Sequence, residues 1–145
     1  MTRAVVTVIL LVPVLFGSCG HGDHHDSPGF PSPGPRAFLF GMKGLPDPEG
    51  QFVATTSDTA VIERLEAQLA LAPSERYLHI HGQIERGNDG NLGWHWHFVP
   101  DRWDAVEVSA EICDGTPADV ENDLDYWVDQ IGIFCPWSSY VQEAL

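Results

Sequence analysis

Residues 76–99, RYLHIHGQIERGNDGNLGWHWHFV, decide the fold of this chain. Both ends of the stretch alternate polar and apolar residues, and this period of two is typical of a β-strand. Between them, residues 87–91 are only Gly, Asn and Asp, which tolerate positive φ in turns. The stretch therefore predicts a β-hairpin with strands over residues 76–86 and 92–99.

Strand parity sorts the hairpin side chains onto two faces, because successive residues of a strand point to opposite sides. The apolar face should pack against helices, and it holds Leu78, Ile80, Ile84, Trp94, Trp96 and Phe98. The other face carries all four hairpin histidines and is expected to stay open to solvent or a ligand. We expect the five tryptophans of the chain to belong mainly to the core.

The histidines form two His-x-His pairs, His79 with His81 and His95 with His97. Two registers remain open. A three-residue loop over residues 88–90 would set His81 opposite His97, whereas a five-residue loop over 86–90 would set His79 opposite His97 and His81 opposite His95. Directly opposed Cβ atoms lie about 4.5–5.5 Å apart, which lets two imidazoles share one metal ion.

This pattern predicts a metal site at the hairpin, with Zn or Cu as the candidate ions because both suit neutral imidazole. Glu111, on a third predicted strand, would be a further ligand or a hydrogen-bonding partner of a ligand. Two alternatives stay open: a polar surface that binds nothing, and a proton-sensing or hydrogen-bonding role. No cofactor is required by any motif of the chain.

The remaining segments predict an α+β domain over residues 36–145. Strands are expected over residues 37–42, 51–56 and 106–113, and helices from the Ser57–Thr59 caps to about Leu71 and from the Thr116–Asp119 capping box to about Ile131. Together with the hairpin they give an antiparallel sheet of about five strands with two helices packed on one face.

The N-terminal segment has the pattern of a secretory signal over residues 1–18, with an apolar run too short to span a bilayer. Phe16-Gly-Ser-Cys19 resembles a bacterial lipobox, with Phe16 where leucine is usual, and the resemblance implies that Cys19 carries acyl chains. Residues 19–35 then form a tether rich in Pro, Gly and His. The expected location is the cell envelope, at the outer membrane or cell surface, and the alternative is a soluble secreted protein.

Charge and cysteine content narrow the class of protein further. The chain has 7 Lys and Arg against 21 Asp and Glu, a net charge of −14, which argues against nucleic acid and is compatible with cationic partners. With Cys19 assigned to lipid, Cys113 and Cys135 remain, and in an oxidising compartment they predict one disulfide. Two free buried thiols are the alternative.

Several short blocks resemble a known family. They are Phe52-Val53 with Asp58 and Val61-Ile62, His79-Ile-His-Gly82, Trp94-His-Trp-His97, Glu111-Ile-Cys-Asp114, Pro117 with Val120-Glu121, and Cys135-Pro-Trp-Ser-Ser139. The chain resembles, from about residue 36 to 145, the N-terminal domain of a slime-mould calcium-dependent calmodulin-binding protein, a domain also present in bacterial secreted proteins. The resemblance implies a fold rather than a reaction, and it favours His79 and His97 as the built-in pair, with Glu111 as their hydrogen-bonding partner. Calmodulin binding is not implied, because neither predicted helix is basic.

The chain contains no Gly-x-Ser-x-Gly, phosphate loop or His-Glu-x-x-His motif that would indicate catalysis. We therefore expect a lipid-anchored envelope protein with a disulfide-bonded domain that binds a ligand without catalysing a reaction. The alternative is a metal-binding protein or small metal-dependent hydrolase that uses the hairpin histidines. A third hypothesis is an inhibitor or interaction module for a secreted enzyme.

Overall fold

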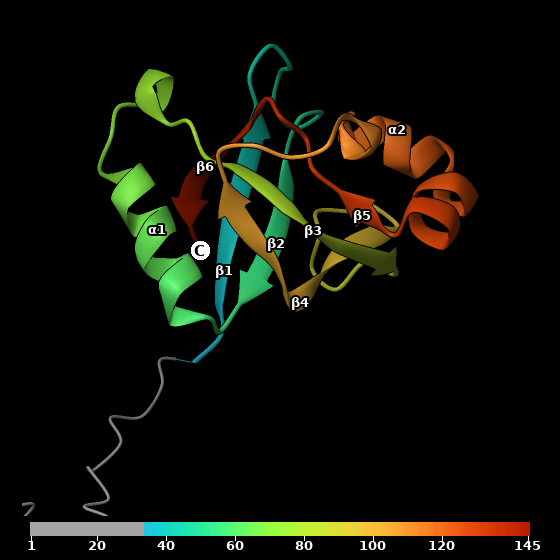
Figure 1. Cartoon of the computed structure of the whole chain (residues 1–145), viewed down its shortest axis with the longest axis horizontal. Helices are drawn as coiled ribbons and strands as arrows, with labels where there is room; N and C mark the ends of the chain where they lie inside the picture. Colours follow the sequence, from blue (N-terminus) through green and yellow to red (C-terminus); the bar gives the residue numbers. More distant parts are fainter. Residues whose placement is uncertain (1–33) are drawn as a thin grey trace, which may run out of the picture.

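The computed structural model describes residues 34–145 (Figure 1). The predicted signal, the lipidation at Cys19 and nearly all of the predicted tether lie outside the described residues. Two three-stranded antiparallel sheets form the domain. The first has the order β2 (Phe52–Thr56), β1 (Arg36–Met42), β6 (Ser139–Ala144), and the second has the order β4 (Trp96–Val106), β3 (His79–Arg86), β5 (Ile133–Phe134).

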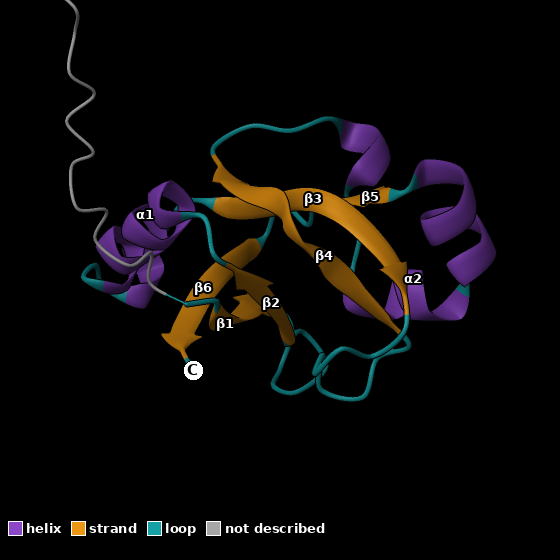
Figure 2. Ribbon diagram, turned by 90° about the horizontal axis from the view of Figure 1, so that it is seen from below, coloured by secondary structure: helices purple, strands orange, loops and turns teal. Residues whose placement is uncertain are grey.

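The α+β class is confirmed, but the expected arrangement of one sheet with two helices on one face is wrong. Helix α1 (Thr59–Leu69) and helix α2 (Pro117–Asn122) lie at opposite ends of the molecule (Figures 1 and 2). The second predicted helix is interrupted at Asp123, whose φ of −144° and ψ of 68° are not helical, and it resumes as the π-helix η3 (Asp125–Ile131). Two short 3₁₀ turns complete the fold, η1 (Pro73–Glu75) and η2 (Glu111–Cys113).

Strand β4 differs most from its prediction, because it starts later than expected and continues through the polar segment that was expected to separate two strands. It can do so because its register on β3 shifts: Phe98 pairs with Ile84, but Trp103 pairs with Gly82. The extra residues form a bulge at Asp101, whose φ is +58° and whose carboxylate accepts hydrogen bonds from Ser57 N at 2.6 Å and Ser57 Oγ at 2.8 Å.

Gly82 is required where the two strands cross at this bulge. A Cβ atom at this position would lie 2.1 Å from Trp103 Cβ and 2.5 Å from its Cα, so no larger residue fits without moving the backbone. Residues 106–113, predicted as a separate strand, are instead the end of β4 and a loop that leads into η2. The outcome is a longer hairpin and no third strand beside the histidines.

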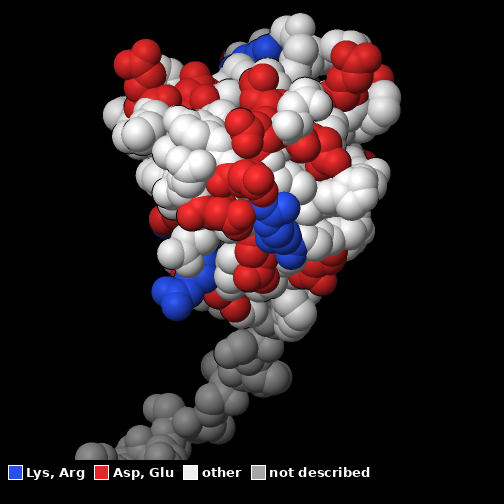
Figure 3. Space-filling model, turned by 90° about the vertical axis from the view of Figure 1, so that its right-hand side faces the viewer, with Lys and Arg blue, Asp and Glu red and all other residues white. Residues whose placement is uncertain are grey.

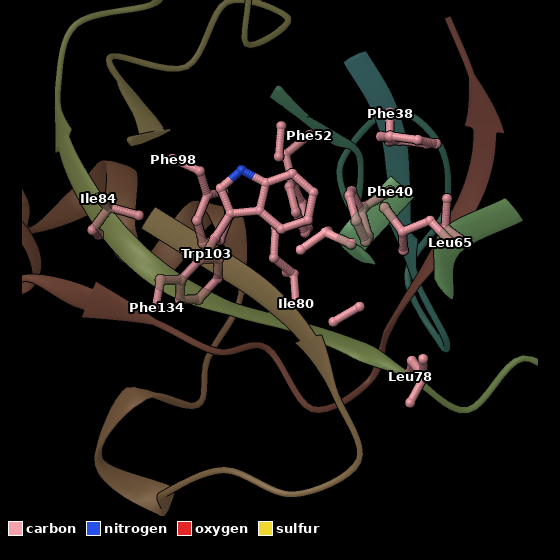
Figure 4. Close-up of a cluster of buried hydrophobic side chains, with 14 of the residues drawn as sticks. Phe38, Phe40, Phe52, Leu65, Leu78, Ile80, Ile84, Phe98, Trp103 and Phe134 are labelled. Carbon is pink, nitrogen blue, oxygen red and sulfur yellow. The ribbon is translucent and has the colours of Figure 1, made fainter. Parts of the chain in front are cut away.

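The core lies between the two sheets and is largely aromatic (Figure 4). Phe52 on β2 is central to it, with ring centroids 5.4 Å from Phe40, 5.7 Å from Phe98 and 6.3 Å from Phe134. The predicted apolar face of the hairpin is confirmed, since Ile80, Ile84, Trp96 and Phe98 are all buried. Helix α1 buries Val61, Ile62 and Leu65 and is capped by Asp58, which accepts from Ala60 N at 2.8 Å.

The expected disulfide between Cys113 and Cys135 is present, with a Cα–Cα distance of 5.1 Å. It joins η2 to the chain just after β5, where Cys135 N also donates to Cys113 O at 2.8 Å. None of the helices within residues 34–145 is both long and apolar enough to cross a membrane.

Candidate functional site

The hairpin histidines are not brought together, and both predicted registers are wrong. His97 pairs with Glu85, His79 pairs with Val106 and His81 pairs with Asp104. His79 and the partner of His97 are therefore six positions apart on β3, a separation of about 20 Å at the usual rise of a strand. The register shift at the bulge and the long connection between the strands are the physical reasons.

The connection from β3 to β4 is held by side chains that the turn signal did not reveal. Gly87 N donates to His95 O at 2.9 Å, which extends the hairpin beyond the expected loop. Asn91 is buried inside the loop, where its Oδ1 accepts from Val53 N at 2.7 Å and its Nδ2 donates to Trp96 O at 2.8 Å. These long-range bonds to β2 and β4 set the loop length, so residues 87–95 alone do not determine it.

His97 is part of the structure of the hairpin end. Its side chain is almost fully buried; Nδ1 donates to Gly87 O at 3.1 Å, and Nε2 lies 3.1 Å from Glu85 Oε1. Its hydrogen-bonding partners are thus a backbone carbonyl and Glu85, and the expected partnership with Glu111 is not found. Both ring nitrogens are already engaged with the protein, which leaves neither directed toward a shared ligand.

His95 is exposed and ties the hairpin to α2. Its Nδ1 lies 2.5 Å from Glu121 Oε1, and its backbone N donates to Glu121 Oε2 at 2.9 Å. Partial burial by itself would raise the pKa of Glu121, but the hydrogen bonds from His95 outweigh it and lower this pKa. His95 therefore acts with a carboxylate of another element, away from the other three histidines.

The remaining predicted ligands are also apart. His81 lines a shallow hollow beside the bulge together with Asp101 and Asp104, and Glu111 is exposed on η2. Within residues 34–145 no three His, Cys, Asp or Glu side chains lie close enough to hold a metal ion together. The geometry of the described residues gives the predicted Zn or Cu site no set of ligands.

His79 instead lies in a pocket of about 270 Å³, which we call the Trp137 pocket. It is lined by Tyr77, His79, Glu107, Val108, Ser109 and Trp137. The pairing of His79 with Val106 brings the residues just before β3 beside those just after β4. Trp137 comes from the loop between β5 and β6 and completes the pocket from a third segment of the chain.

The polar part of the pocket is a hydrogen-bonded pair, with His79 Nε2 2.6 Å from Ser109 Oγ. His79 is only 4% exposed. Burial lowers the pKa of His79, the neighbouring His81 lowers it further, and Asp114 acts in the opposite direction. The imidazole is therefore neutral at pH 7, and with Ser109 it offers uncharged donors and acceptors.

The apolar part of the pocket is exposed to solvent. Tyr77, Val108 and Trp137 are 58%, 82% and 45% exposed, although most large apolar side chains of the described residues are buried. Single exposed apolar residues are ordinary on protein surfaces, but three around one pocket indicate a surface that makes contact with something else. Trp137 thus corrects the expectation that the tryptophans belong to the core.

Two sequence blocks noted for the family resemblance meet at this pocket. Asp114, from the Glu-x-Cys-Asp block, accepts a hydrogen bond from Trp137 N at 2.9 Å through Oδ1, which also accepts from Gly115 N at 3.0 Å. The Cys113–Cys135 disulfide joins the same two blocks. Their residues therefore position the Trp137 wall, and this pairing was the one sequence signal that pointed to the pocket.

Tyr77, Glu107, Val108 and Ser109 were missed because nothing in their local sequence distinguishes them from loop residues. Their significance depends on the pairing of β3 with β4, which places two chain ends side by side. Chemically, the pocket offers two aromatic walls, one exposed carboxylate and a neutral His–Ser pair. This combination is suited to holding a small group by stacking, charge and hydrogen bonds.

The α+β fold and this pocket define the class: a small domain of the binding type. Residues 35–145 match the family model of the N-terminal domain of the calmodulin-binding protein that the sequence blocks resemble, and the chain belongs to that family. The resemblance inferred from those blocks is thereby confirmed over the whole domain. No curated protein and no solved structure matches the chain.

Proposed function

We propose that this protein is a lipid-anchored protein of the cell envelope whose domain binds a ligand in the Trp137 pocket without catalysing a reaction. The observation that carries the binding role is the pair of exposed aromatic walls above a buried, neutral His79–Ser109 pair. Keeping two large aromatic side chains exposed costs hydrophobic stabilisation that burial would supply, and a bound ligand would cover them.

The proposed location is supported by the sequence of the first 19 residues and by the disulfide. A signal-like apolar run precedes Cys19, and a disulfide such as Cys113–Cys135 is typical of proteins in oxidising compartments. Residues 19–35, rich in Pro and Gly, would hold the domain away from the membrane surface as a tether. The pocket would then meet ligands in the surrounding medium or on a neighbouring molecule.

The binding role is tested with protein that carries 5-fluorotryptophan, in which each of the five tryptophans gives a separate ¹⁹F NMR signal. The Trp137→Phe variant assigns the pocket signal. The purified protein is screened against separate mixtures of organic cations, organic anions, neutral aromatics and saccharides. We expect at least one mixture to shift the Trp137 signal while the signal of the fully buried Trp96 stays in place.

The matched variants are Tyr77→Ala, which removes a pocket wall, and Leu92→Ala, which removes a side chain of similar exposure (54%) outside this pocket. Tyr77→Ala should weaken the binding found in the screen about tenfold, the equivalent of one lost stacking contact, and Leu92→Ala should leave it unchanged. The proposal is contradicted when no mixture moves the Trp137 signal, or when the two variants weaken binding equally.

A further inference from the structure

The charges and aromatic walls of the Trp137 pocket specify its ligand more closely. We propose that the pocket takes the side chain of a lysine or arginine from a basic segment of a partner protein. The inference rests on the proposed binding function and adds to it the chemical class of the ligand. Its three supports are the aromatic walls, the balance of charge and the neutral floor of the pocket.

The walls have the composition that binds organic cations. The negative faces of Tyr and Trp rings attract an ammonium or guanidinium group, and the aliphatic stem of the same side chain packs against the rings. Tyr77 and Trp137 are both exposed and line the same pocket, with Val108 as an additional apolar contact for a stem. The volume of about 270 Å³ suits one long side chain better than a large cofactor.

The charges of the domain also favour a cation. Glu107 is the one ionised side chain expected in the pocket lining at pH 7, and none of the lining residues is Lys or Arg. Acidic side chains are spread over the face of the domain that Figure 3 shows, and few basic ones interrupt them. A basic partner would be attracted by the net charge of −14 before it reached the pocket.

The chain's own basic side chains are already engaged. Five of the six Lys and Arg within residues 34–145 donate hydrogen bonds to acceptors of the same domain, namely Arg36, Lys43, Arg64, Arg76 and Arg86. None of these bonds involves Glu107. The carboxylate in the pocket is therefore left without an ion pair from the described part of its own chain, and a cation from outside would supply one.

The floor of the pocket does not oppose a cation at neutral pH. The groups around His79 are Ser109, Tyr77 and Glu107 in the pocket, His81 on the same strand and Asp114 on the η2 side. Burial keeps the imidazole uncharged at pH 7. Acidification that protonates His79 would place a positive charge beneath the bound cation and weaken binding.

The experiment titrates the purified protein with three peptides that differ at one central residue: lysine, Nε-acetyl-lysine and norleucine, with glycine elsewhere and blocked ends. The readout is the ¹⁹F signal of Trp137. We expect the lysine peptide to bind at least fivefold more tightly than the two uncharged peptides, since cation–π attraction and the Glu107 charge act on it alone. Its affinity should fall as the salt concentration rises from 50 to 500 mM.

Glu107→Gln and Glu49→Gln form the matched pair of variants. Glu49 is an exposed carboxylate beside Trp94 in another hollow of the domain, so its loss changes the net charge equally without touching the Trp137 pocket. Glu107→Gln should weaken the lysine peptide about threefold to fivefold, and Glu49→Gln should have little effect. Equal effects of the two variants would mean that only the net charge matters, and the inference would fall.

The outcomes separate this inference from the proposed function. If the acetyl-lysine peptide binds as well as the lysine peptide, or if saccharides alone shift the Trp137 signal, the pocket binds a ligand but the cation is overturned. If neither the peptides nor any mixture of the earlier screen shifts this signal, both proposals fail.

Discussion

At the scale of single residues, three histidines of one hairpin have three different environments. His97 is buried between Gly87 O and Glu85, His95 is exposed and joined to Glu121, and His79 is buried against Ser109. Their sequence context, two His-x-His pairs, does not distinguish them. The differences arise from which chain segment each strand end meets, and only His79 lies in a pocket together with exposed aromatic side chains.

A second residue-scale feature is Arg76, a buried guanidinium that pairs with backbone carbonyls. It donates to Val141 O at 2.8 Å and Gln142 O at 3.2 Å on β6, and to Leu69 O and Leu71 O at the end of α1. Helix C-termini leave such carbonyls without partners, and a cation there is favourable. Arg76 thus joins α1 to β6 and orients the chain that leads to Tyr77.

The lowered pKa of His79 predicts how stability depends on pH. In the unfolded chain His79 titrates near its ordinary value, about 6.5, and in the folded protein it binds a proton only at lower pH. As the pH falls below about 6.5, the unfolded state gains the proton first, so the free energy of unfolding decreases until the folded pKa is passed. Above that range His79 contributes no pH dependence.

Urea unfolding at pH 7.5 and pH 5 measures this contribution in the wild type, in His79→Gln and in His95→Gln as an exposed control. The loss of stability on acidification should be smaller in His79→Gln than in the other two proteins. If His79→Gln does not fold, NMR titration of the wild-type His79 ring gives the pKa directly. A ring pKa at or above 6.5 would contradict the prediction.

At the scale of elements, the Cys113–Cys135 disulfide and Asp114 organise the wall that Trp137 provides. The bond joins η2 to the end of β5, two segments separated by 22 positions in sequence. Asp114 then receives Trp137 N two residues beyond Cys135. A short loop without regular hydrogen bonding thereby has its position fixed by one covalent bond and one carboxylate.

Removing the disulfide with the double variant Cys113→Ala and Cys135→Ala should lower the free energy of unfolding by about 3 kcal/mol, because the unfolded chain regains the entropy of an open loop. Denaturant unfolding monitored by circular dichroism measures the change. Wild-type protein reduced with dithiothreitol should match the double variant. An unchanged midpoint in both would show that the bond contributes nothing to stability.

At the scale of the whole molecule, an acidic, disulfide-bonded domain with a binding pocket follows a segment that has the features of a lipoprotein signal. The negative charge is unsuited to direct attraction by anionic lipid, so membrane attachment would depend on acyl chains at Cys19 rather than on the domain surface. The surface then stays available for a basic partner.

Cys19→Ser is therefore expected to release the protein from membranes into the soluble or secreted fraction, as measured by cell fractionation and immunoblotting. Phe16→Leu, which supplies the usual lipobox residue, is the control and should remain attached. Washing with high salt should not release the wild type, whereas detergent should. Membrane retention of Cys19→Ser at the wild-type level would rule out the lipid anchor.

By itself the sequence determined those features that depend on local geometry. The period of two determined the buried face of the hairpin, Asp58 and Thr116 marked the starts of the helices, and the family blocks identified the domain. Each of these follows from the backbone period of a strand, the unpaired N–H groups of a helix start or a short run of residues, so neighbours in sequence are sufficient.

Only the tertiary structure decided the register of the hairpin and the position of the site. The register depends on Asn91 bonding to Val53, on Asp101 bonding to Ser57 and on the close contact of Gly82 with Trp103. These partners lie far away in sequence, and a shift of register changes which residues meet at the strand ends. For this reason the metal site predicted at the hairpin was replaced by the Trp137 pocket, where three distant segments supply a neutral histidine, a carboxylate and two exposed aromatic rings.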